Sequence, residues 1–515
     1  MFCKTVSECL REPSLETEKR SGSSVRDKGL SLFLFFCLSV VAAADSSKSQ
    51  PVDTTQLTAW LTGGISSTRL VQLIHQRGLA VVPTENEIHQ LQALGADEKL
   101  VRTLAGVRPP DSHSQRTSIP AALLQAAAGA HAGRYHEAEL QLRAALRIDP
   151  QNPAIHFALA AMFRQQELWD DAYDELTMAA RLMPDFPENH SSLAYVFYRL
   201  DDGPNAIAEA RTGLSMDPQN AEAYQYLGLG LYSNGQYAAA VHAFAESLAR
   251  DPDNPDTYYD MGIALQADGR LVAAAGAYRY AIHLRPAFWE AHSNLGLVLH
   301  QDGKLDEAIA QYREAKNIAP NEASVRNNLG NTYCDHGDFD AAIAELSELY
   351  RRHPDWEQGH SCLASAYMSK KNYGSAIREL HLAIHQQPTD AAQHRLLGQA
   401  LLLDGKAEEA LREFRLAVTL DPDSDVAHHY LGTALFQDQK LQAAEKEFRE
   451  ALRLKASADN HYSLAACLMS MDRYQEALTE LEIAARLDPE SPLYRARREE
   501  LMKLLKDSSS RQKQN

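Results

Sequence analysis

Residues 223–252 read AYQYLGLGLYSNGQYAAAVHAFAESLARDP, and this stretch decides the fold. Leu227 and Leu231 are four residues apart and share one face of a first helix, while Ala240 and Phe244 share one face of a second. The glycine of the sequence SNG lies between the helices, where a turn requires positive φ. The final proline ends the second helix because it cannot continue the hydrogen-bond pattern. The stretch therefore predicts a pair of helices joined by a tight turn.

The same pattern recurs along the chain with a period of 34 residues, marked by Pro150, Pro184, Pro218, Pro252, Pro286, Pro320, Pro354, Pro388 and Pro422. Eleven units start at Ile119, Pro153, Pro187, Ala221, Pro255, Trp289, Ala323, Glu357, Ala391, Asp425 and Ala458. Counted from these starts, position eight is always Ala or Gly and position twenty is always Ala, which lets paired helices approach closely. A fixed period of this length predicts a solenoid, in which each unit buries its apolar face against its neighbours.

The pattern resembles the tetratricopeptide repeat over residues 119–489. The resemblance implies an all-α fold, namely a right-handed superhelical solenoid of eleven helix-turn-helix repeats with a concave groove that binds a protein or peptide segment. Five repeats carry a residue other than glycine at position fifteen, so their turns are expected to form without glycine: Glu167, Asp201, Lys371, Gln439 and Asp472.

Residues 53–106 do not follow the period and are predicted to form a small helical module. It is similar to short helical modules that precede repeat arrays in exported bacterial proteins. Short helices are predicted at 57–61, 68–76 and 84–94, the third opened by a capping box at Thr84. Linkers are predicted at 45–52 and 107–118.

The repeats are followed by a further amphipathic stretch and a polar tail. Residues 490–507 are predicted to form a cap helix, because the last repeat of such an array needs a solvated end. Residues 508–515 are predicted to be disordered.

Residues 1–44 are predicted to contain a leader and a signal peptide. The apolar run at 30–44 is too short for the roughly 20 residues of a transmembrane helix, follows Arg26 and Lys28, and ends in three alanines. A short membrane anchor or a buried helix is the alternative. Residues 1–24 are long for a signal-peptide leader, so we hypothesise that they are not translated. We expect an exported protein, periplasmic or secreted, anchored at the N-terminus if the signal is not cleaved.

Three cysteines lie beyond the predicted signal: Cys334, Cys362 and Cys467. Because the number is odd and no C-x-x-C pair occurs, the sequence predicts neither a disulfide framework nor a zinc site. Free thiols buried in helices are expected instead.

The overall charge excludes one class of partner. The chain has 51 basic and 69 acidic residues, a formal charge of -18, which has the wrong sign for a surface that neutralises nucleic-acid phosphates. With 45% hydrophobic and 23% charged residues, the composition is that of a folded protein. A neutral or basic protein partner is predicted.

Histidine occupies position four in seven repeats: His156, His190, His292, His360, His394, His428 and His461. Equivalent residues of neighbouring repeats are separated by roughly 8–10 Å, so two of them do not reach one zinc ion. We therefore predict no metal site, and expect these rings to fill the slot between successive helices. A second hypothesis is that protonation near pH 6 loosens the stack.

In the family that the pattern resembles, positions two, five, nine and twelve line the concave groove. Tyrosine offers stacking area with a polar tip, and amides pair with both C=O and N–H of an extended peptide. The alternative is an ordinary solvated helix surface. The candidate peptide-binding residues, with two asparagines from position six, are Phe157, Tyr195, Tyr198, Tyr232, Tyr259, Asn294, Asn327, Asn328, Asn331, Arg395, Gln399, His429 and Tyr462.

No phosphate loop, G-x-S-x-G elbow or H-E-x-x-H motif occurs, so we predict a non-catalytic scaffold or assembly factor without cofactor or small-molecule substrate. Asn294 and Asn328 are similar to the asparagine ladder of the repeats of O-linked N-acetylglucosamine transferases. A regulatory or substrate-recruiting component related to those enzymes is therefore one alternative. A self-associating structural protein is another.

Overall fold

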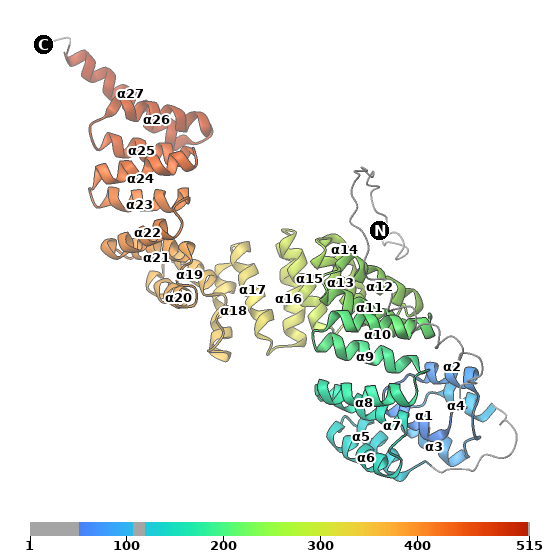
Figure 1. Ribbon diagram of the computed structural model, residues 1–515. Coiled ribbons are helices and arrows are strands. Elements are labelled where there is room, and N and C mark those ends of the chain that lie inside the picture. Colours follow the sequence, from blue (N-terminus) through green and yellow to red (C-terminus); the bar gives the residue numbers. More distant parts are fainter. Residues whose placement is uncertain (1–50, 107–118, 513–515) are drawn as a thin grey trace, which may run out of the picture. The chain divides into compact units, whose positions relative to one another are not determined.

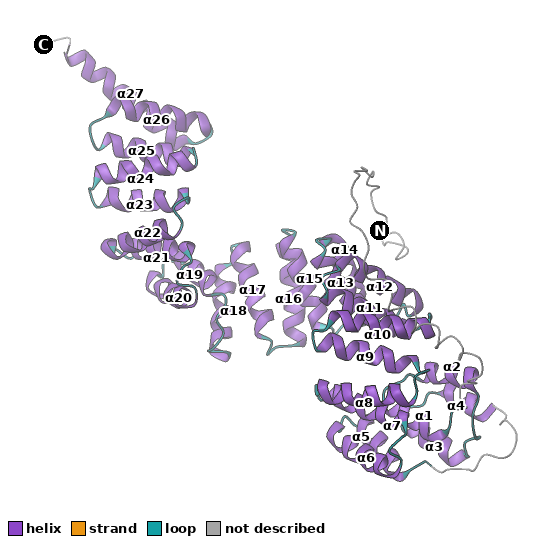
Figure 2. Cartoon of the chain, viewed as in Figure 1, coloured by secondary structure: helices purple, strands orange, loops and turns teal. Residues whose placement is uncertain are grey.

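The computed structural model describes residues 51–106 and 119–512, with side chains up to residue 505. These residues form 27 helices and no strand beyond an isolated β-bridge (Figure 1, Figure 2). The predicted leader at 1–44, most of the linker at 45–52 and the linker at 107–118 lie outside the described residues. No described helix combines the length and apolarity that a membrane crossing requires. The helices form two compact units, which meet in the sequence at Pro286 and Ala287.

The first unit begins with the predicted module. Its first two helices are longer than predicted, its third is slightly shorter, and a fourth was not predicted. The capping box at Thr84 is present. Val52, predicted to lie in a linker, belongs to the module, because its N–H donates to the carbonyl of Gly78 and its own carbonyl accepts from Ala80. The module's four helices are α1 (Thr54–Thr62), α2 (Ser67–Arg77), α3 (Glu85–Ala93) and α4 (Glu98–Gly106).

The first unit continues with five helix pairs, one for each predicted repeat up to Pro286. Asn152 and Asn254 cap the first helices of their repeats, and a proline follows each cap at the first helical position, where its missing N–H costs nothing. The pairs are α5 (Ala121–His131) and α6 (Tyr135–Ile148), α7 (Pro153–Gln165) and α8 (Trp169–Leu182), α9 (Pro187–Arg199) and α10 (Gly203–Met216), α11 (Ala221–Ser233) and α12 (Tyr237–Arg250), and α13 (Pro255–Ala267) and α14 (Leu271–Leu284).

The second unit holds six helix pairs and a final helix. The final helix, α27 (Pro492–Gln512), continues beyond the predicted cap into the predicted tail, since no glycine or proline interrupts residues 493–512. The pairs are α15 (Trp289–Gln301) and α16 (Leu305–Ile318), α17 (Ala323–His336) and α18 (Phe339–Arg352), α19 (His360–Ser369) and α20 (Tyr373–Gln386), α21 (Ala391–Leu403) and α22 (Ala407–Leu420), α23 (Asp425–Gln437) and α24 (Leu441–Leu454), and α25 (Ala458–Met469) and α26 (Tyr474–Leu487). The predicted all-α array of eleven helix-turn-helix repeats is thus confirmed.

Within a repeat, the residue at position eight of the first helix lies against the residue at position twenty-four of the second. A Cβ atom added to Gly228 would stand 2.5 Å from the ring of Phe244, and one added to Gly398 would stand 2.6 Å from Phe414. Repeats with alanine at position eight carry a smaller residue at position twenty-four, as Ala160 does with Leu176. The side chain at position twenty-four thus fills the space that a larger residue at position eight would need.

The five glycine-free turns adopt the backbone conformation that glycine prefers. Position fifteen has φ of 58° or 59° in all five: Glu167, Asp201, Lys371, Gln439 and Asp472. Six other repeats place glycine there, with φ between 70° and 86°. The prediction that these turns form without glycine is confirmed, although the left-handed conformation costs an L-residue roughly 1–2 kcal/mol.

The position-four histidines lie between successive helices of the chain, as predicted. Each contacts a residue nineteen positions later, on the second helix of its own repeat. Six rings place Nδ1 at 2.5–2.7 Å from a glutamate oxygen: His156 and Glu175, His190 and Glu209, His360 and Glu379, His394 and Glu413, His428 and Glu447, and His461 and Glu480. In repeat six, Gln311 stands in place of the glutamate, 2.9 Å from His292.

At His156, the contact with Glu175 opposes the predicted loosening of the stack by protonation. In His156, Nε2 also lies 3.1 Å from the carbonyl of Pro150, so both ring nitrogens face acceptors. Burial lowers the pKa of this ring, but the bonds to Glu175 and to the Pro150 carbonyl outweigh burial, and the pKa of His156 is raised. Protonation therefore strengthens this contact instead of loosening the stack.

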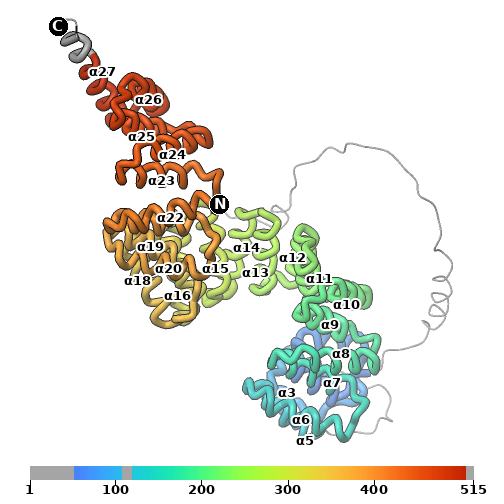
Figure 3. Tube along the Cα trace, turned by 60° about the vertical axis from the view of Figure 1, so that its left-hand side comes forward, coloured from blue at the N-terminus to red at the C-terminus, as the bar shows by residue number. Residues whose placement is uncertain are grey.

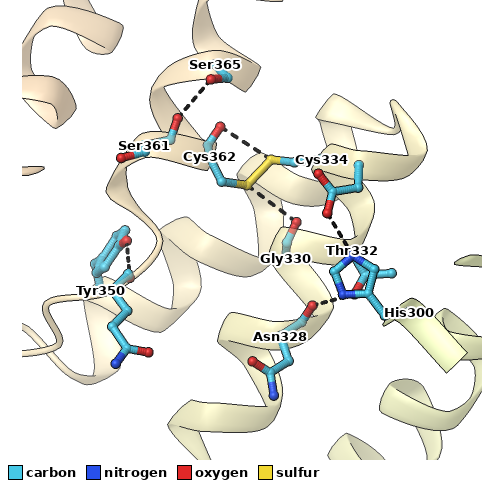
Figure 4. The surroundings of a disulfide bond; sticks show 11 residues. His300, Asn328, Gly330, Thr332, Cys334, Tyr350, Ser361, Cys362 and Ser365 are labelled. Carbon is cyan, nitrogen blue, oxygen red and sulfur yellow. Dashed lines mark hydrogen bonds and ion pairs between the residues drawn. A yellow bond between two sulfur atoms is a disulfide. The ribbon is translucent and has the colours of Figure 1, made fainter. Parts of the chain in front are cut away.

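A disulfide bond joins Cys334 on α17 to Cys362 on α19, with Cα atoms 6.1 Å apart (Figure 4). The prediction of free thiols was wrong for this pair, because the two residues occupy positions twelve and six of neighbouring first helices, where they face each other. Cys467 is free and buried, as predicted, and burial raises the pKa of its thiol to about 11. That thiol stays protonated and unreactive at neutral pH.

Replacing Gly228 with alanine should destabilise the repeat by about 1–3 kcal/mol, because the added methyl overlaps the Phe244 ring. Adding Phe244→Leu should recover most of this loss, since Ala–Leu is the combination found in repeat two. Chemical denaturation of both single variants and the double variant measures the coupling. If the losses of the two single variants simply added in the double variant, the two side chains would not be competing for the same space.

Glu175→Gln should destabilise the chain more at pH 5.5 than at pH 8. The pKa of His156 is raised above its ordinary 6.5, so its stabilising charge is present at the lower pH and is lost as the pH rises through the raised value. Gln311→Glu, which places a carboxylate opposite His292, should stabilise more at pH 5.5. The melting temperatures of both variants are compared with that of the wild type at each pH. If each variant changes the melting temperature equally at pH 5.5 and pH 8, the histidine–glutamate charge pairing is refuted.

Breaking the disulfide should lower the free energy of unfolding by about 3 kcal/mol, because the bond closes a loop of 28 residues in the unfolded chain. Denaturation of the wild type with and without a thiol reductant, beside Cys362→Ser, measures this loss. The reductant should leave the Cys362→Ser variant unaffected and should still destabilise a Cys467→Ala variant.

Candidate functional site

The first helices of consecutive repeats carry the predicted binding residues, and we call their exposed face the first-helix surface. In the first unit it is formed by α7, α9, α11 and α13. It starts beneath the module, where Trp60 of α1 stacks on Phe186 with ring centroids 4.7 Å apart. Figure 3 shows the blue helices of the module against the first repeats.

Ion pairs also hold the module on the repeats. Arg69 of α2 contacts the carboxylates of Glu188 and, at 2.9 Å, of Asp217. Arg77 donates to the backbone carbonyl of Asp185 at 2.9 Å. The module thus covers the first-helix surface from α7 to the start of α9.

Phe157, the first predicted binding residue, lies under this cover. Its side chain is buried between Gly63 at the end of α1 and the ring of Phe186. Its position in the repeat indicated an open groove, but the module occupies that part of the surface. Phe157 holds the module and the repeats together.

Beyond the module, Tyr195 and Tyr198 lie side by side on α9 with ring centroids 6.2 Å apart, and both are half-buried. The guanidinium of Arg164 lies over the Tyr195 ring at 4.8 Å. On the same ring, Tyr226 of α11 packs at 5.1 Å. The predicted tyrosines of α9 therefore belong to one aromatic cluster with an arginine in it.

A carboxyl group lies next to this cluster. Gln225 of α11 donates from Nε2 to Oδ2 of Asp260 on α13 at 2.8 Å. Burial raises the pKa of Asp260 to about 7; the Gln225 bond opposes this shift and Asp256 adds to it. Asp260 interacts electrostatically with Tyr198, whose hydroxyl pKa is raised by its own burial and by this carboxyl. The charged form of Asp260 is thus disfavoured by its surroundings.

The other two tyrosines of this unit lie on the same helices. Tyr232 of α11 packs on Tyr237 with centroids 5.6 Å apart and interacts with Tyr198. Tyr259 of α13 packs on Tyr278 at 5.9 Å. The structure brings Tyr195, Tyr198 and Tyr232 into one group.

The remaining predicted residues belong to the second unit and do not form a comparable cluster there. Arg395 donates to Gln399 at 3.5 Å and lies 5.9 Å from the Tyr430 ring. His429 bonds Asn460 of the next repeat at 2.8 Å, and Tyr462 packs on Tyr494 of α27. Asn327 is buried, whereas three other amide residues are half-buried: Asn294, Asn328 and Asn331.

Sequence reasoning missed Gln225, Tyr226 and Asp260 as members of the cluster. The available signal was position six, where Asp260 is the only acidic residue among the eleven repeats. Position six had been considered only for asparagine. Arg164, which sequence reasoning also did not select, is part of the same cluster.

In the described residues, no three His, Cys, Asp or Glu side chains converge as metal ligands. The acid pair Asp170 and Asp171 lies in the first turn of α8, where carboxylates face the helix dipole favourably. What the cluster offers is a set of aromatic faces and hydrogen-bonding groups suited to binding.

Family models described as tetratricopeptide repeat match residues 259–323, 429–492, 299–366 and 333–400, and one described as TPR repeat matches residues 228–269. No curated protein sequence matches the chain.

Solved structures similar to the chain include a tetratricopeptide repeat protein from Parabacteroides merdae, at 16% identity and a TM-score of 0.40, covering 48% of this chain and 98% of that one. Yeast Tom70 has 14% identity and a TM-score of 0.33, with 75% and 95% covered. MamA from Desulfovibrio magneticus has 21% identity and a TM-score of 0.32, with 32% and 94% covered. From its eleven helix pairs and these family matches, the chain is a tetratricopeptide repeat protein.

Proposed function

We propose that this protein is a non-catalytic scaffold or assembly factor that holds an extended protein segment against the first-helix surface of its first unit. The observation that carries the proposal is the half-buried group of Tyr195, Tyr198 and Tyr232, which lies beyond the module. Tyrosines in this setting supply contact area at small entropic cost and still offer a hydroxyl.

The surface differs chemically from the interior of the array. In the core of each repeat, a small residue at position eight faces the side chain at position twenty-four, which in most repeats is leucine or an aromatic residue. Arg164 and Gln225 play no part in that core contact, yet both are ordered by polar partners: Arg164 donates to Ser192 at 3.3 Å and Gln225 donates to Asp260. A polar, preorganised surface of this kind suits recognition of a peptide backbone.

We further propose that the protein acts outside the cytoplasm. The predicted signal at residues 30–44 supports export, and the disulfide between Cys334 and Cys362 supports an oxidising compartment. The two observations are independent, because one lies in the leader and the other in the repeats.

A photoreactive amino acid at Tyr198 of the full chain, introduced in its native host, tests the function. Irradiation should give discrete adducts with a second protein, identified by mass spectrometry of the joined peptides. The matched control carries the same amino acid at Val272 on α14, which is 81% exposed and lies on a second helix. It should give none of these adducts.

Identical adducts at both positions, or none at Tyr198, would contradict the assignment of the surface. Adducts made only with a second copy of the chain would favour the self-associating alternative. Turnover of a sugar nucleotide by the purified chain would favour the transferase-related one.

A further inference from the structure

We propose that Asp260 is a subsite for a lysine or arginine side chain of the bound segment. This inference rests on the proposed function, since it names the chemistry of the partner at the same surface. It would make Asp260 the residue that selects a basic partner.

Asp260 differs from every other residue at its position. The other ten repeats place apolar, hydroxyl, amide or disulfide-bonded cysteine side chains at position six, so the carboxyl is not required by the repeat. Its one hydrogen bond comes from the neutral amide of Gln225. A neutral donor orients a carboxylate without neutralising it.

No cation of the described residues lies within ion-pair distance of Asp260. The two arginines of the neighbouring cluster are engaged elsewhere. Arg164 lies over Tyr195 and donates to Ser192. Arg199 lies over the Trp169 ring at 4.2 Å and donates to the Tyr195 hydroxyl at 3.3 Å.

The other carboxylates of this surface do have partners. Glu222 accepts a hydrogen bond from the Tyr226 hydroxyl at 3.1 Å and interacts electrostatically with Arg164. Asp256 pairs with Arg285 through two bonds of 2.7–2.8 Å. Asp260 is therefore the carboxylate whose charge is left to a ligand. Its half-buried position raises its pKa, as expected for an acid that lacks a counter-ion.

The surroundings favour a cation over other ligands. Tyrosine faces attract lysine and arginine, and partial burial strengthens that attraction. A chain with a formal charge of -18 draws cationic partners and repels acidic ones. A neutral segment would bury this carboxylate without compensation.

Immobilised peptides with blocked termini test the inference. Three matched sets of 15-residue sequences carry at their centre lysine or arginine, norleucine, or glutamate. The full wild-type chain should be retained about tenfold more strongly on the basic set than on the norleucine set. Asp260→Asn, which preserves the shape of the side chain, should remove this preference while keeping its binding to norleucine peptides.

The matched control is Asp174→Asn on α8, which removes an exposed carboxylate from a second helix. It should keep the full preference; an equal loss in this variant would mean that net charge alone selects the peptides and would overturn the subsite. A preference that survives in Asp260→Asn would also overturn it. Equal retention of all three sets by the wild type refutes the subsite alone, whereas retention of none refutes the proposed function as well.

Discussion

The contact between positions eight and twenty-four constrains every repeat of this protein, because it sets how closely the two helices of a pair approach. Glycine at position eight is matched by a ring in five of six cases, as Gly228 is by Phe244, and alanine is matched by leucine or alanine. In nine of the eleven repeats the two side chains are either glycine with a ring or alanine with leucine, two combinations of similar total volume. Packing at close to crystalline density allows little variation in such a sum.

This constraint explains why the fold could be predicted from the sequence while several contacts could not. The 34-residue period, the alanine at position twenty and the turn at position fifteen all act within one repeat, so each is visible locally. The disulfide is not local. Cys334 and Cys362 are 28 residues apart, and this spacing becomes meaningful only once the register between neighbouring first helices is known. The histidine contacts had a visible signal, a glutamate nineteen residues after each of six histidines, as in His156 and Glu175.

The candidate site was predictable to a similar extent. Tyr195, Tyr198 and Tyr232 were expected at groove positions, and the structure groups them, because position in the repeat determines which face a residue occupies. Phe157 also lies at a predicted groove position of its repeat, but the module covers it. That cover depends on how Trp60 and Arg69 dock on a distant segment of the chain, which no periodicity within the repeats encodes.

The acidic residues of the repeats fall into two groups, those that contact a partner within the repeat and one that lacks a charged partner. Glu175 and its five counterparts are carboxylates that contact a histidine ring of the same repeat, so each has a hydrogen-bond partner wherever the repeat is folded. Asp260 stands at a position that carries no acid in the other repeats, and in the described part of the chain its carboxyl accepts a side-chain hydrogen bond only from a neutral amide. A half-buried carboxylate that lacks a counter-ion among the described residues costs stability, and it breaks the local consistency that folding favours. Such a departure, placed among tyrosines on an otherwise regular surface, indicates that the compensating charge belongs to a partner.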